Sequence, residues 1–75
     1  MTRDDWKRVR RALRQAQIDE EISARNLEQI AAEIEHTSPG KAVVADLRSA
    51  AAFRREEAND YGRTLDAVIE AGHSK

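Results

Sequence analysis

The stretch His36-Thr37-Ser38-Pro39-Gly40-Lys41 decides the fold, because it is the one place where the helical pattern of the chain is interrupted. It contains the only proline of the 75 residues and one of the three glycines. Pro39 disfavours helical backbone at Ser38 and suits a first helical position, with Ser38 as the N-cap. We therefore predict a helix over about residues 3–36, a turn at 37–40 and a second helix over about 39–72.

Residues at the ends of the two predicted helices also favour the start or the end of a helix. Thr2 is followed three residues later by Asp5, which resembles a capping box with Asp in place of Glu. Acidic side chains suit the positive N-terminal end of a helix dipole, and His36 suits the negative end. Gly72 is expected to end the second helix.

Both segments repeat at alternating spacings of three and four residues, which is typical of a coiled-coil seam. The predicted seam consists of Trp6, Val9, Leu13, Ala16, Glu20, Ser23, Leu27, Ile30 and Ile34 in the first helix, and of Val44, Leu47, Ala51, Arg54, Ala58, Tyr61, Leu65, Val68 and Gly72 in the second. A short turn makes two such helices antiparallel neighbours. The fold class is therefore all-α, a two-helix antiparallel coiled-coil hairpin forming one domain over residues 1–75. It resembles small bacterial hairpins that dimerise into four-helix bundles, a likeness of fold that implies no function.

Folding the chain at Pro39 pairs seam residues whose numbers sum to 77 or 78. This alignment predicts Trp6 against Gly72, and it places Arg54 opposite Ser23 and one layer from Glu20. An Arg beside a Glu offsets the cost of burying either charge alone. We interpret Glu20, Ser23 and Arg54 as a buried polar layer that fixes the alignment, with a pocket for an anionic ligand as the less favoured interpretation.

The beginning of the first helix is strongly basic. Six positive side chains, Arg3, Lys7, Arg8, Arg10, Arg11 and Arg14, oppose the helix dipole, so local helix energetics do not explain them. Lys7, Arg8, Arg11 and Arg14 are candidates for binding an anion such as a nucleotide or nucleic acid. The competing interpretation is neutralisation by Asp60, Asp66 and Glu70. A net charge of −1 argues against a dedicated nucleic-acid binder.

Apolar residues also occur away from the predicted seam. Ile18 and Ile22 are four residues apart on the outer side of the first helix, and Phe53 is expected at nearly the same height on the same side. We interpret these three as a partner-binding surface. Small and apolar residues beside the seam favour assembly into a four-helix bundle or a higher homo-oligomer, with a dimer favoured.

Several classes of function are disfavoured by the composition. The chain has no cysteine, its longest apolar runs have four residues, and its two histidines lack metal-ligand spacing. We expect no metal, cofactor, membrane span, secretory signal or enzymatic activity, and a cytoplasmic location. The sequence favours a small non-enzymatic binding or regulatory module that self-associates and engages a protein partner. The alternative is an anionic-ligand binder that uses the basic cluster at a subunit junction.

Overall fold

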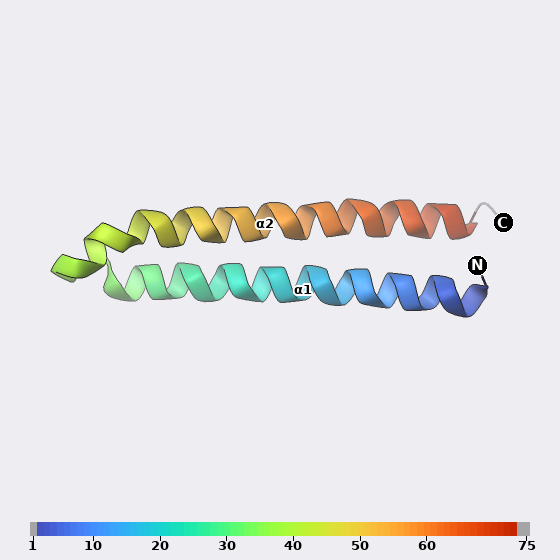
Figure 1. Cartoon of the computed structure of the whole chain (residues 1–75), viewed down its shortest axis with the longest axis horizontal. Helices are drawn as coiled ribbons and strands as arrows, with labels where there is room; N and C mark the ends of the chain where they lie inside the picture. The colour runs from blue at the N-terminus through green and yellow to red at the C-terminus, as the bar shows by residue number, and fades with distance from the viewer. Residues whose placement is uncertain (1, 74–75) are drawn as a thin grey trace.

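The chain folds into two long helices that lie antiparallel against each other, which confirms the predicted hairpin (Figure 1). The computed structural model describes residues 2–73, without the side chains of residues 38–40 and 73. Helix α1 spans Arg3–Ile34 and helix α2 spans Ser38–His73. The beginning of α1 and the end of α2 lie at the same end of the hairpin, opposite the turn (Figure 1).

Helix α1 begins with the predicted capping box. The backbone N–H of Asp5 donates to Thr2 Oγ1 at 3.2 Å, and the backbone N–H of Thr2 donates to Asp5 Oδ2 at 3.0 Å. The hydrogen bond from the Thr2 backbone holds the pKa of Asp5 below the ordinary Asp value of 3.8, since it favours the charged carboxylate. An Asp at this position therefore replaces the usual Glu of the motif.

The turn is shorter and earlier than predicted. Helix α1 ends at Ile34 and α2 begins at Ser38, so the turn comprises residues 35–37. Both the N–H and the hydroxyl of Thr37 donate to the Ile34 carbonyl, at 3.0 and 2.8 Å, which closes α1 two residues before the predicted end. The Thr37 carbonyl then accepts from Lys41 N–H, so Thr37 occupies the N-cap position expected of Ser38. The side chain of Ser38 lies outside the described residues.

The seam of α2 follows the prediction, whereas the seam of α1 is rotated. Among the residues whose side chains are described, six apolar ones are buried: Ala24, Ala31, Val44, Ala51, Ala58 and Leu65. The predicted seam residue Ile30 is instead 45% exposed, because its neighbour Ala31 points at α2. Alanine lets the two helix backbones approach more closely than isoleucine would, and the larger side chain is displaced to the edge of the contact.

The space that a side chain at Gly72 would enter is not filled by Trp6, which was predicted to pack there. Among the described side chains, the atom nearest to a Cβ placed on Gly72 is Arg10 Nη1, at 3.6 Å. A Cβ on Gly62 would lie 2.9 Å from Gln17 Nε2. Arg10 and Gln17 occupy the same helical position as Ala24 and Ala31, at intervals of seven residues. Gly62 and Gly72 of α2 therefore make room for long polar side chains of α1.

The hairpin is long, thin and rich in exposed surface. It measures 58 × 15 × 12 Å, and its radius of gyration is 17.0 Å, compared with about 11 Å for a compact chain of this length. Its accessible surface is 5626 Å², about 1,000 Å² more than the ~4,650 Å² typical of a folded monomer of 8.5 kDa. No large side chain among the described residues is fully buried. A single hairpin thus leaves an unusual share of its surface in contact with water.

Candidate functional site

The buried residues define two edges along the helix contact. In an α-helix, the fourth residue after a given position lies about 40° to one side of it, and the residue just before it lies about 100° to the other side. One edge consists of the positions four residues after a buried residue, with their seven-residue repeats. They are Lys7, Arg14, Glu21 and Glu28 in α1, Glu35 just after it, and Arg48, Arg55, Gly62 and Ile69 in α2. Positions just before a buried residue, with the same repeats, form the other: Val9, Ala16, Ser23 and Ile30 in α1, and Val43, Ala50, Glu57, Thr64 and Ala71 in α2.

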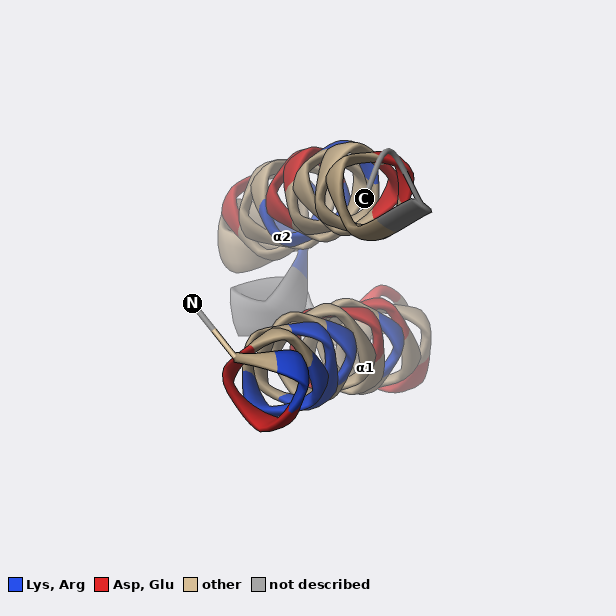
Figure 2. Ribbon diagram, turned by 90° about the vertical axis from the view of Figure 1, so that its right-hand side faces the viewer, with Lys and Arg blue, Asp and Glu red and all other residues tan. Residues whose placement is uncertain are grey.

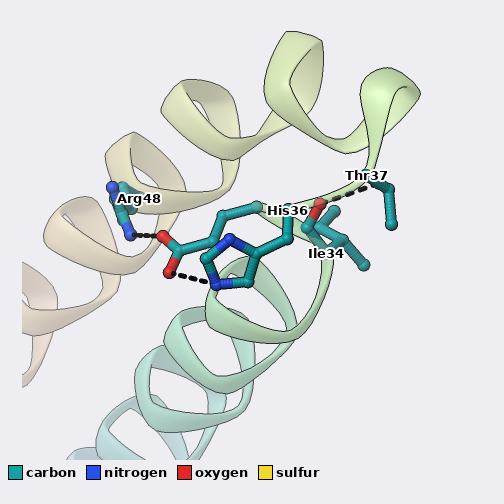
Figure 3. A network of polar contacts seen from close by, with 5 residues as sticks. Ile34, His36, Thr37 and Arg48 are labelled. Carbon is teal, nitrogen blue, oxygen red and sulfur yellow. Dashed lines mark hydrogen bonds and ion pairs between the residues drawn. The ribbon is translucent and has the colours of Figure 1, made fainter.

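The first of these is the charged edge, and ion pairs tie the two helices together along it. Arg48 Nη2 lies 2.8 Å from Glu35 Oε2, and the other carboxylate oxygen of Glu35 lies 3.5 Å from His36 Nε2 (Figure 3). One helical repeat away, Arg55 binds Glu28, with Nε at 3.0 Å from Oε1. Exposed pairs of this kind are each worth roughly 0.2–1 kcal/mol, so they fix alignment more than they add stability.

The second is the neutral edge, which has one charged residue, Glu57, among its nine positions, where the charged edge has seven. Its most exposed large apolar side chains are Ile30 and Val43, which are 45% and 44% exposed. Apolar side chains along this edge are therefore exposed to water, whereas most charged side chains of both helices lie on other faces. Sequence reasoning missed this edge because it placed Ile30 and Ser23 inside the seam.

The predicted surface of Ile18, Ile22 and Phe53 is exposed, but its members come from different faces. Ile18 and Ile22 lie on the side of α1 that is turned away from α2, as expected. Phe53 is 58% exposed and follows Ala51 by two residues, on the same side of α2 as the neutral edge. Phe53 thus extends the neutral edge, whereas the two isoleucines belong to the outer face of α1.

The predicted polar layer forms, but it is not buried. Arg54 Nη1 lies 3.2 and 3.4 Å from the two carboxylate oxygens of Glu20, so Arg54 pairs with the residue that the prediction placed one layer away from it. The Arg54 side chain is 46% exposed and that of Glu20 is 16% exposed. Ser23 is half-buried and makes no side-chain hydrogen bond to another described residue. In a single hairpin this layer remains open to water, because only two helices surround it.

The basic cluster lies at the open end of α1 (Figure 2). Among residues 2–73, no ion pair joins Arg3, Lys7, Arg8, Arg10, Arg11 or Arg14 to an acidic side chain. Asp60, one of the expected partners, binds Arg63 of its own helix instead. Lys7, Arg10, Arg11 and Arg14 together with Gln15 and Ile18 line a shallow groove of about 310 Å³, which we call the basic groove.

The described part of the chain offers neither a cluster of metal ligands nor a membrane span. Within residues 2–73, no three His, Asp or Glu side chains come together as a set that could hold a metal ion. Neither α1 nor α2, over the residues described, has a stretch apolar and long enough to cross a bilayer. The surface features that stand out are therefore the neutral edge and the basic groove.

Comparison with known proteins adds no relative: no family model, no curated protein and no solved structure matches this chain. Its function is accordingly argued from its own geometry.

Proposed function

We propose that this protein is a small, non-enzymatic binding or regulatory module that self-associates through its neutral edge. The observation that carries the proposal is the contrast between the two edges: seven of the nine positions of the charged edge carry a charge, whereas the neutral edge has only Glu57 and exposes Ile30 and Val43. On the neutral side, the Glu20–Arg54 ion pair bridges the helices at one level. Monomeric proteins rarely expose a long uncharged strip, whereas helices of a four-helix bundle need one.

The amount of exposed surface supports a second copy as the occupant. The hairpin has about 1,000 Å² more surface than a compact monomer of its mass, and one partner of a standard interface buries about 800 Å². The neutral edge runs from Val43 to Ala71 along α2, about 42 Å at 1.5 Å per residue, so an identical hairpin supplies a surface of matching length and chemistry. A dimeric four-helix bundle is the simplest assembly of this kind, and a cytoplasmic location fits the lack of cysteines in the chain.

Sedimentation equilibrium at micromolar concentrations tests this proposal, and a mass of twice 8.5 kDa is expected. Ile30→Glu removes an apolar side chain that a lone hairpin leaves exposed, so the helix content of the monomer is retained. Losing the two isoleucines of a dimer, at about 1.5 kcal/mol each, weakens association on the order of a hundredfold.

Ala32→Glu is the matched control, because it adds the same charge two residues away at an exposed position on the outer side of α1. It is expected to leave the dimer intact. A folded wild-type monomer at these concentrations contradicts the proposal, as does equal association of the Ile30→Glu and Ala32→Glu variants.

A further inference from the structure

The basic groove lies on the other side of α1 from the neutral edge. Lys7 and Arg14 belong to the charged edge, and Arg11 and Ile18 lie further round on the outer face of the helix. A hairpin that pairs through its neutral edge therefore leaves this groove facing water. The groove is available to a different molecule whether or not the protein has dimerised.

No ion pair between described side chains neutralises the positive charge of the groove. Its four cations, Lys7, Arg10, Arg11 and Arg14, make no ion pair with any described residue. Like charges three and four residues apart destabilise a helix by roughly 0.2–0.5 kcal/mol per pair, and cations near a helix N-terminus add to this. Such an arrangement is unfavourable for the hairpin alone, and an anionic ligand would remove the repulsion.

The groove is not uniformly polar, and this narrows the choice of ligand. Gln15 and Ile18 form its end nearer the middle of the helix, and the exposed Ile22 continues the outer face one turn further. The surface thus passes from four positive charges to two apolar side chains within about 23 Å of helix, at 1.5 Å per residue. A ligand that fits the whole surface carries acidic groups at one end and apolar groups at the other.

We propose that the basic groove and the adjoining Ile22 bind an acidic, amphipathic helix of a partner protein. The inference names a partner for the binding role proposed above and rests on that role. Carboxylates of the partner would face Lys7, Arg11 and Arg14, and its apolar residues would cover Ile18 and Ile22. Grooves of this kind accept helices whose contacts recur every three or four residues.

Nucleic acid fits the same surface less well. The phosphate backbone needs cations but has no use for two exposed isoleucines. No aromatic side chain lines the groove for stacking on bases, since Trp6 is half-buried beside the seam. The rest of the chain is acidic, with twelve acidic against seven basic residues in 15–75, and it repels a long polyanion.

The test uses the full chain and three probes. The first is a synthetic helical peptide with glutamates at one end and leucines at the other, the second is the same peptide with glutamine in place of glutamate, and the third is single-stranded DNA. Binding is followed by fluorescence anisotropy at physiological salt. The acidic peptide is expected to bind more tightly than the other two probes.

Two substitutions and one control distinguish the contribution of the basic residues from that of the apolar residues. Lys7→Gln is expected to weaken acidic-peptide binding about threefold to tenfold, and Lys41→Gln, which removes an exposed lysine at the far end of the hairpin, to leave it unchanged. Ile18→Ser is expected to weaken binding of the acidic peptide and to leave binding of DNA unchanged. Equal binding of both peptides, tighter binding of DNA, or no effect of Ile18→Ser overturns the inference.

Sedimentation equilibrium on the same samples keeps the two proposals apart. Loss of peptide binding by a protein that still dimerises refutes the partner assigned to the groove and leaves self-association standing. A monomer that binds the acidic peptide refutes self-association and supports the groove.

Discussion

Replacing Gly62 by alanine tests the packing of α2 on α1 at one point. Alanine is about 1 kcal/mol more favourable than glycine in a helix interior, so the change should stabilise α2. However, the new Cβ would lie 2.9 Å from Gln17 Nε2, which is too close, and the Gln17 side chain must move. Because that amide is the far end of a flexible side chain, its displacement offsets about half of the gain, and a net stabilisation of about 0.5 kcal/mol is expected.

The matched experiment repeats the change in a Gln17→Ala background, where nothing opposes the new Cβ. The full gain of about 1 kcal/mol is then expected, which raises the melting temperature by about 4–8 °C, against about 2–4 °C in the wild-type background. Thermal unfolding followed by circular dichroism at one fixed protein concentration measures both. An equal gain in the two backgrounds would refute the position assigned to Gln17 and, with it, the rotated seam of α1.

Three further predictions concern the N-terminal cap of α1 and two of the ion pairs between the helices. The folded-state pKa of Asp5 lies below 3.8, so the stability that its carboxylate contributes to the fold is complete above that pH and is lost as the pH falls through the folded value. Circular dichroism from pH 7 to pH 2 should show this loss in the wild type and not in Asp5→Asn. Arg54→Leu should change stability by less than about 1 kcal/mol in urea unfolding, because Glu20 keeps partial access to water; a much larger loss would mean the pair is buried. Glu35→Gln should cost about 0.5 kcal/mol in the same assay, and Arg48→Ala should then add nothing further, since the two act as one pair.

Much of the architecture could be predicted from the sequence, because single residues with strong backbone preferences set it. Pro39 and its neighbours indicated the reversal, and Thr2 with Asp5 indicated the helix start, both at close to the right place. That Arg54 and Glu20 lie close together was also predictable, since two helices joined by a short turn align their positions by simple arithmetic, although the arithmetic placed Arg54 opposite Ser23 and one layer from Glu20. The early end of α1 could not be predicted, because it depends on the hydrogen bond from the Thr37 hydroxyl to the Ile34 carbonyl.

The rotation of α1 escaped prediction because two faces of this helix compete. Val9 and Ile30 are larger apolar residues than Ala24 and Ala31, so a hydrophobic pattern favours them as core. The structure selects the alanines, since close approach of two backbones rewards small side chains. A signal was nevertheless present: acidic residues in α1 and arginines in α2 share a spacing of seven, and the ion pair of Glu28 with Arg55 follows only from the rotated seam.

The alanine-lined contact between the helices also sets how this protein should respond to heat and denaturant. Four of its six buried apolar residues are alanines, so unfolding one hairpin hydrates little new hydrocarbon. The heat-capacity increment and the urea m-value, which both scale with newly hydrated surface, should therefore fall below those usual for 75 residues. For the lone hairpin, the free energy of unfolding should therefore vary little with temperature, and thermal unfolding should extend over a broad temperature range. A steep unfolding transition would indicate that additional surface is buried by association.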